Sequence, residues 1–174
     1  MYKRQEKAIG FEIGTGSGCI AETLARLRPH WKVLAGDISS SALKTAKKNF
    51  KSSNSFLIQA DLLFGLTEHS FDFIISNPPY VDPKTRPNLT RDLSYEPDLA
   101  LFSSNHGLFH LEKILQAARN YLKPGGRIFL EHGYDQGAAC RNLGEALGYT
   151  SIQTHKDLGN NDRVFEAIYG SSAS

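Results

Sequence analysis

The chain has 174 residues, of which 40% are apolar and 22% charged, so it is long enough to bury the core of one globular domain. Its net charge of only +2 argues against a dedicated nucleic-acid-binding protein, because such proteins cluster basic charge on one face. The two cysteines, Cys19 and Cys140, lack paired spacing, as in cytoplasmic proteins with reduced thiols, and no apolar run is long enough to span a bilayer.

Short apolar runs alternate with helical periods along the chain, a pattern typical of a parallel α/β sheet. In chain order, the first predicted elements are a strand over 8–13, a helix ending at Pro29, a strand over 31–35, a helix capped by Ser39 or Ser40, and strands over 56–58 and 71–75. The helices are predicted because apolar residues recur three or four positions apart, as at Ile20, Leu24 and Leu27.

The second half of the chain begins with a long irregular segment, residues 81–105, and such a segment in a compact domain is usually functional or disordered. The elements predicted after it are a helix from Leu108 to Leu122 stopped by Pro124, a strand over 127–131, a helix over 136–147 closed by Gly148, and a pair of strands over 152–155 and 164–168. The predicted domain therefore spans 8–169, between a stub, 1–7, and a polar tail, 170–174, that we expect to be disordered.

A glycine-rich turn follows the first predicted strand directly. It comprises Gly14, Thr15, Gly16, Ser17 and Gly18. Glycines at alternate positions permit a tight turn and let a ligand approach the backbone closely. Asp37 ends the second predicted strand, where its carboxylate could hold a ribose diol through both oxygens. These features favour a nucleoside cofactor, although the turn has neither the dinucleotide spacing nor the lysine of a P-loop.

The segment Asn77, Pro78, Pro79 and Tyr80 follows the fourth predicted strand. Its two prolines remove two backbone donors, which leaves the carbonyl oxygens of Asn77 and Pro78 without a local N–H partner. A planar amino group could donate its two hydrogens to acceptors of Asn77 and Pro78 while the ring of Tyr80 packs on its face. The segment therefore predicts a binding site for an amide or a nucleobase.

Three other features were weighed as functional candidates. His106 and His110 are four residues apart, which can place two imidazoles on one helix face, but no third ligand accompanies them and no metal site is predicted. Glu131 is expected to anchor a neighbouring loop, with a role in shaping the substrate site as the alternative. Arg163 is expected to brace the terminal pair of strands.

The glycine-rich turn combined with Asn77 to Tyr80 resembles the class I S-adenosylmethionine-dependent methyltransferases. The resemblance implies a Rossmann-like α/β fold: a mainly parallel seven-stranded sheet in the order 3-2-1-4-5-7-6, with helices on both faces and an antiparallel last strand. The cofactor would be S-adenosyl-L-methionine, with S-adenosyl-L-homocysteine as product. The residues implied to bind it are Glu12, Gly14, Thr15, Gly16, Ser17, Gly18, Asp37, Asp61, Leu62 and Asn77.

Within this implied cofactor site, Asp61 would receive the adenine amino group and Leu62 would cover the face of the ring. Taken alone, Glu12 could instead be an edge carboxylate and Asp61 a turn cap. Tyr95, Glu96 and Pro97 would border the substrate groove.

Four segments narrow the resemblance to the HemK (PrmC) type of release-factor glutamine methyltransferase. They are residues 76–81, 95–101, 130–133 together with Gln136, and 156–163. The implied reaction transfers a methyl group to the side-chain amide nitrogen of the glutamine in the Gly-Gly-Gln loop of a peptide chain release factor. Asn77, Pro78 and Tyr80 would be the catalytic residues and, with Pro79, would bind the substrate. Hydrogen-bond acceptors for both N–H groups of the substrate amide should increase the electron density on its nitrogen. Neither a metal nor a strong general base is expected.

The sequence departs from this family at its beginning. HemK-type enzymes normally carry a helical N-terminal domain that helps to bind the release factor, whereas the residues before Ala8 are fewer than the roughly 12–15 that one marginally stable helix needs. The chain is therefore expected to be a fragment or a stand-alone catalytic domain with weaker binding of its partner.

Two other functions remain open: an amino-methyltransferase acting on adenine or cytosine in nucleic acid, and a catalytically weak cofactor-binding domain. A cytoplasmic monomer without direct contact to nucleic acid or membrane is the default expectation.

Overall fold

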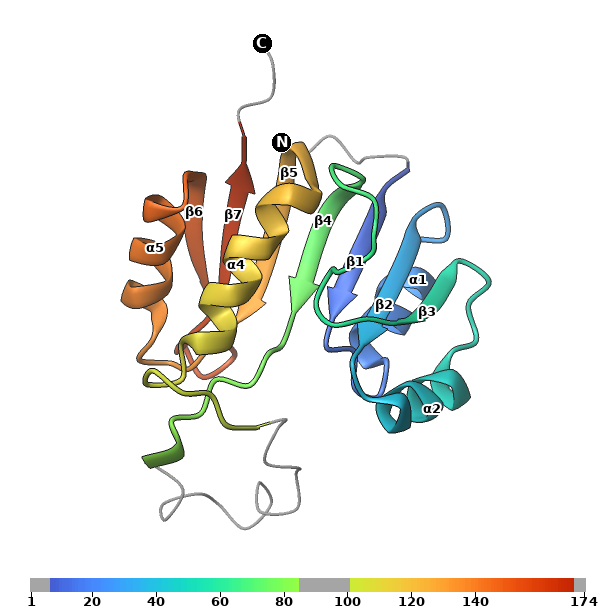
Figure 1. Cartoon of the computed structure of the whole chain (residues 1–174), viewed down its shortest axis with the longest axis horizontal. Helices are drawn as coiled ribbons and strands as arrows, with labels where there is room; N and C mark the ends of the chain where they lie inside the picture. Colours follow the sequence, from blue (N-terminus) through green and yellow to red (C-terminus); the bar gives the residue numbers. More distant parts are fainter. Residues whose placement is uncertain (1–6, 85–100, 171–174) are drawn as a thin grey trace.

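The computed structural model describes residues 7–84 and 101–170. Within them, seven strands form one sheet in the order β3-β2-β1-β4-β5-β7-β6 (Figure 1). The strands are β1 (Ile9–Ile13), β2 (Lys32–Asp37), β3 (Ser55–Gln59), β4 (Phe71–Ser76), β5 (Leu122–Glu131), β6 (Tyr149–Lys156) and β7 (Asp162–Tyr169). β1 to β5 pair in parallel, and β7 is antiparallel to both β5 and β6. The predicted strand order and the antiparallel last strand are confirmed.

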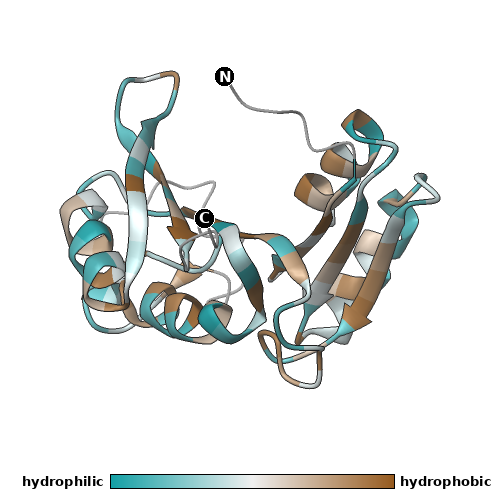
Figure 2. Ribbon diagram, turned by 90° about the horizontal axis from the view of Figure 1, so that it is seen from above, coloured by the Kyte–Doolittle hydropathy of each residue, from teal (hydrophilic) through white to brown (hydrophobic). Residues whose placement is uncertain are grey.

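Helices cover both faces of the sheet, as predicted. They are α1 (Cys19–Leu27), α2 (Ser40–Asn49), α4 (Phe109–Tyr121) and α5 (Gly137–Ala146). In Figure 1, α4 crosses in front of the sheet and α1 lies behind it. Side chains alternate along a strand, so Val33 and Ala35 of β2 pack with α1 while Leu34 packs into the larger core cluster beneath α4 and α5. Figure 2 accordingly shows hydrophobic colour along the central strands and mixed colour along the helices.

Local signals set most of the element boundaries. Ser39, one of the two predicted caps, begins α2, because its hydroxyl oxygen accepts a hydrogen bond from the Ala42 N–H at 3.3 Å. Gly148, with a φ of 80°, follows the end of α5. Both cysteines are free thiols, as expected. None of the helices in the described ranges is long and apolar enough to cross a membrane.

The start of β5 differs from the prediction. Leu122 was expected to end the preceding helix, but it adopts extended geometry and pairs with Phe71 as the first residue of the strand. A register shift then places Arg127 opposite Phe73. Leu122 is buried, and its spacing from the apolar residues of α4 fits a continued helix. Pairing with β4 nevertheless gives it an extended conformation.

Two other boundaries also fall earlier than predicted. β6 begins at Tyr149 and β7 at Asp162, because their first residues include polar ones that an apolar pattern does not report. In the irregular segment, Val81 forms an isolated bridge with Phe102. Residues 85–100, which include the predicted groove residues Tyr95, Glu96 and Pro97, lie outside the described ranges.

Gly10 offers a direct test of the packing between β1 and β4. A side chain at Gly10 would meet the ring of Phe73 at 1.9 Å, so no space exists for even one methyl group. We expect Gly10→Ala to lower the free energy of unfolding by about 1–3 kcal/mol, measured by urea denaturation. Combining it with Phe73→Leu should cost less than the sum of the two single changes. Additive effects would contradict the contact.

Candidate active site

The glycine-rich turn between β1 and α1 has the backbone that its sequence predicted. Gly14, Gly16 and Gly18 adopt φ angles of 68°, 55° and 82°, in the left-handed region that favours glycine. A Cβ added at Gly14 or Gly16 would meet nothing within 4 Å, so the surface of the turn is open there. At Gly18 a Cβ would lie 2.5 Å from the ring of Phe50, because α2 packs closely against the turn.

Glu12 holds the turn from beneath. Its side chain is only 2% exposed, and its Oε2 accepts hydrogen bonds from the Thr15 hydroxyl at 2.5 Å and from the Ala21 N–H at 3.1 Å. Burial raises the pKa of this carboxyl from 4.5 to about 7, against the opposing effect of the two hydrogen bonds. Glu12 therefore joins β1, the turn and α1, and the alternative of an edge carboxylate is wrong because β1 lies inside the sheet.

Asp37 closes the turn from the neighbouring strand. Its Oδ2 accepts the Gly16 N–H at 2.9 Å and its Oδ1 accepts the Ser39 N–H at 2.8 Å. The Thr15 N–H also reaches the carbonyl of Gly36 on the same strand, at 2.9 Å. Each carboxylate oxygen has a further lone pair, so these bonds leave acceptor capacity for hydroxyl groups. The structure thus brings Asp37 to the glycine turn with both oxygens already oriented.

Asp61 and Leu62 follow β3, near the end of β2, because the Ala60 N–H donates to the carbonyl of Asp37 at 3.2 Å. Asp61 is exposed, and its carbonyl accepts the Phe64 N–H at 3.1 Å. Leu62 has a φ of 52° and packs partly against the larger core. Both residues line a pocket of about 460 Å³ that α4 bounds on its other side. Neither the glycine turn nor Asn77 lines that pocket.

Ile38 is a candidate that the sequence analysis missed. It directly follows Asp37, whose carboxylate bonds the glycine turn, and its side chain is 66% exposed. The Gln59 side chain donates a hydrogen bond to its carbonyl at 3.1 Å, which holds the backbone in place. A large apolar residue between an acidic strand end and a serine N-cap, where no core face requires it, was the available signal.

Asn77 emerges at the same edge of the sheet, directly after β4. The hydroxyl of Ser76 donates to the carbonyl of Ile13 at 2.8 Å, which ties the end of β4 to the end of β1. Asn77 is exposed, whereas Pro78 is buried. Among residues 7–84 and 101–170, none hydrogen-bonds the Asn77 carboxamide. Asn77 is therefore an exposed amide group at the strand end next to the start of the glycine turn.

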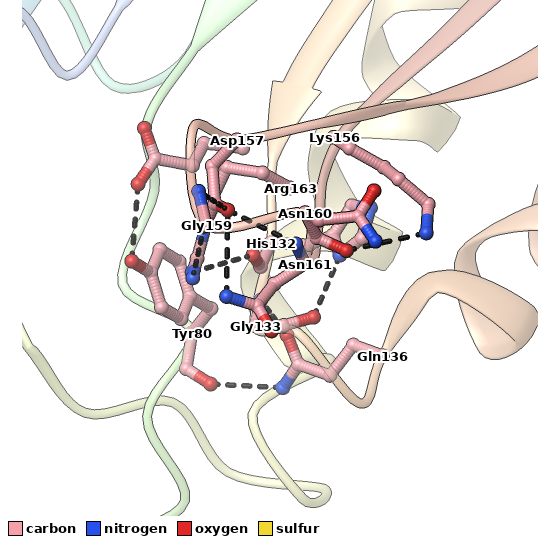
Figure 3. Close-up of polar contacts among 11 residues, drawn as sticks. Tyr80, His132, Gly133, Gln136, Lys156, Asp157, Gly159, Asn160, Asn161 and Arg163 are labelled. Atoms are coloured by element: carbon pink, nitrogen blue, oxygen red, sulfur yellow. Dashed lines mark hydrogen bonds and ion pairs between the residues drawn. The ribbon is translucent and has the colours of Figure 1, made fainter.

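Tyr80 is held at both ends. Its hydroxyl donates to Glu131 at 3.0 Å, and its carbonyl accepts the Gln136 amide at 2.9 Å (Figure 3). Burial and the neighbouring Glu131 raise the pKa of Tyr80, which keeps the phenol protonated and donating. This contact gives Glu131, the last residue of β5, the anchoring role expected from its place at the strand end.

The remaining candidates have structural partners of their own, although Arg163 also lies close enough to Tyr80 to interact with its phenol. Arg163 donates to Asp157 from Nε and Nη2, at 3.2 and 3.1 Å, and to the carbonyl of His132, so it braces the β6–β7 pair against β5. His106 Nδ1 contacts Asp82 and His110 Nδ1 contacts Ser103, so the two imidazoles do not converge. Within the described part of the chain, no group of three potential ligands could hold a metal ion.

The raised pKa of Glu12 predicts a pH dependence of stability. Between pH 4.5 and about 7 the folded chain binds more protons than the unfolded chain, so the stabilising contribution is complete below pH 4.5 and is lost as the pH rises through about 7. The loss should amount to about 3 kcal/mol. We expect Glu12→Gln, which keeps an acceptor for Ala21, to remove this part of the dependence. Urea unfolding across the range measures it, and parallel curves for both proteins would contradict it.

Two relatives of this chain are named as release factor glutamine methyltransferases. A release factor glutamine methyltransferase of Shewanella oneidensis is 39% identical over 155 residues, covering 87% of this chain and 54% of that protein. Another, of Lactococcus lactis, is 43% identical over 157 residues, covering 88% of this chain and 58% of that protein. The chain thus spans little more than half the length of these relatives.

The fold comparison and the family model agree with these relatives. The crystal structure of a methyltransferase from Pyrococcus furiosus matches with a TM-score of 0.71 at 22% sequence identity, over 94% of this chain and 76% of that one. The family model of the methyltransferase small domain matches residues 2–102. Because this match covers more than half of the sequence, the chain belongs to the methyltransferase small domain family.

Proposed function

We propose that this chain is the catalytic part, residues 8–169, of an S-adenosylmethionine-dependent enzyme that methylates the side-chain amide nitrogen of the glutamine in the Gly-Gly-Gln loop of peptide chain release factors. The observation that carries the proposal is the exposed carboxamide of Asn77, which lies between the glycine turn and the anchored Tyr80. The names of the two relatives support the choice of release factor as substrate.

The residues around the glycine turn fit the cofactor. The open surface at Gly14 and Gly16 leaves room for the methionine part along the backbone of Thr15 and Ser17, while Gly18 is committed to packing. Glu12 would act by fixing the turn, and Asp37 would bind the ribose hydroxyls through its remaining lone pairs.

At the adenine end, Asp61 would receive the amino group, and Leu62 and the exposed Ile38 would cover the ring. S-adenosylmethionine supplies an activated methyl group on a sulfonium. Because that group is already reactive, the protein mainly has to align the nitrogen with the methyl carbon.

Asn77, Pro78 and Tyr80 would supply this alignment. The Asn77 carboxamide and the Pro78 carbonyl would accept the two N–H groups of the substrate amide, and the ring of Tyr80 would pack on its face, above Pro79. Both acceptors increase electron density on the nitrogen, which forms the new bond to carbon as the carbon–sulfur bond breaks. The extra proton leaves to solvent once the methyl group has transferred. Alignment of the amide nitrogen with the methyl carbon can lower the activation free energy by up to about 7–11 kcal/mol in the best cases. Pro78 is buried whereas Asn77 is exposed, so Asn77 is the more accessible of the two acceptors.

We further propose that the protein is a cytoplasmic monomer and that its substrate is a protein. An amino group on adenine or cytosine would present the same two N–H groups to Asn77 and Pro78, so DNA and RNA are included in the test as competing substrates. A domain that binds cofactor without transferring methyl is the other outcome that the test separates.

Asn77→Ala tests the proposed reaction. We expect the rate of methyl transfer to the Gly-Gly-Gln glutamine, followed by mass spectrometry, to fall by roughly 100-fold, as when a single transition-state hydrogen bond is lost. Binding of S-adenosylhomocysteine, measured by calorimetry, should change little. Asn120→Ala, at an exposed asparagine of α4, is the matched control.

Three results would count against the proposal. An unchanged rate in Asn77→Ala would remove Asn77 from the mechanism. Transfer into DNA or RNA in preference to release factor would identify the competing function. Clear binding heat without any transfer by the unsubstituted chain would identify a cofactor-binding domain.

A further inference from the structure

Gln136 joins three loops at the proposed substrate side of the site, two of which, those of Tyr80 and Gly133, are drawn in Figure 3. Its Nε2 donates to the carbonyl of Tyr80 at 2.9 Å and to the carbonyl of His106 at 3.0 Å, and its Oε1 accepts the Gly133 N–H at 2.8 Å. The residue is only 8% exposed. Both amide hydrogens and the amide oxygen are thus used, which leaves a single orientation of the side chain that satisfies all three partners.

The backbone that Gln136 holds before α4 is unfavourable by itself. Asn105 and His106 have φ angles of 54° and 55°, in a region that residues with side chains rarely adopt. Gly107 follows at 83°, and a Cβ there would lie 2.1 Å from the carbonyl oxygen of Tyr80. Such a conformation persists only where surrounding contacts impose it. The bond from Gln136 to His106 is one of those contacts.

The same amide reaches the proposed acceptor segment. Tyr80 is three residues after Asn77, and the bonds from Gln136 and to Glu131 hold its backbone and its ring from opposite ends. The next residue, Val81, donates its N–H to Leu101 at 2.9 Å and accepts the Ser103 N–H at 2.9 Å. Pro78 and Pro79 have restricted φ angles, so fixing the Tyr80 carbonyl also limits the carbonyls that precede it.

We propose that Gln136 is a positioning residue of the methyl-transfer site, an inference that rests on the proposed function. Its amide sets the main chain of Tyr80 against the loop before α4, and through it the acceptors of Asn77 and Pro78. Gln136 touches neither the glycine turn nor Asp37, so its contribution falls on the substrate side alone.

Two substitutions separate hydrogen bonding from packing. Gln136→Leu removes both donors at similar volume. Gln136→Glu replaces the donors by an oxygen that faces two carbonyl oxygens, so the introduced carboxyl can help only when protonated, through one O–H donor. Burial favours that protonated form. The activity of Gln136→Glu relative to the unsubstituted chain should therefore rise as the pH is lowered from about 8 to about 6.

The experiment measures methyl transfer to release factor as a function of pH, together with amide hydrogen exchange. We expect Gln136→Leu to lower kcat by roughly 10–100-fold at every pH, with KM for S-adenosylmethionine changed by less than about threefold. Exchange of the Val81 and Gly107 amides, which are bonded to Leu101 and Ser103, should quicken by roughly tenfold. Gln153→Glu, at an exposed glutamine of β6, is the matched control and should leave both readouts unchanged.

The outcomes distinguish this inference from the proposed function. An active unsubstituted chain with unchanged kcat in both Gln136 variants would overturn the inference alone. Faster exchange with unchanged kcat would also overturn it, because the contact would then serve stability only. A Gln136→Glu variant without the pH-dependent recovery would exclude the donor role. An unsubstituted chain that transfers nothing to release factor would overturn the proposed function and, with it, the catalytic part of the inference.

Discussion

Parallel pairing of β1 with both of its neighbours is the constraint on which the site depends. Ile13 is in register with Gly36 of β2 and with Ser76 of β4, so the three strands end side by side. Parallel strands present their carboxyl ends at one edge of a sheet, where ligands of open α/β sheets bind. The residues that follow, Asp37 and Asn77, are thereby placed on either side of the glycine turn. Neither would meet it if one strand were reversed or shifted by a single residue.

The glycine turn is held by two carboxylates that differ in accessibility. Glu12 is buried in the central strand and bonds the turn and α1 from inside, while Asp37 bonds it from the neighbouring strand and remains partly exposed. Burying a carboxylate is unfavourable unless hydrogen bonds compensate, and the raised pKa of Glu12 shows that they do so only in part. An apolar residue at position 12 would avoid this cost but could not hold the turn. The buried carboxylate therefore fixes the geometry of the turn at the expense of stability.

The proposed substrate side of the site is built in a different way. Its segment after β4 is irregular, so it cannot rely on strand pairing, and side chains from β5 and the loop before α5 hold it instead. Glu131 and Gln136 take opposite ends of Tyr80, and Arg163 fixes the neighbouring loop through the carbonyl of His132. The proposed cofactor side therefore depends on backbone geometry, and the proposed substrate side depends on side-chain hydrogen bonds.

Local patterns were enough to predict the glycine turn, the N-cap near Ser39 and the amide at the end of β4, whereas the strand order was implied by the resemblance to a family. Each depends on a few consecutive residues whose conformational preferences agree with the final fold. Contacts between distant segments were not predictable from such patterns. The early start of β5 at Leu122 follows from pairing with β4, and the bonds that occupy both oxygens of Asp37 follow from the position of the turn. The same holds for Gln136, whose sequence neighbours give no sign that it meets Tyr80 and His106, because only the packed sheet brings those three loops together.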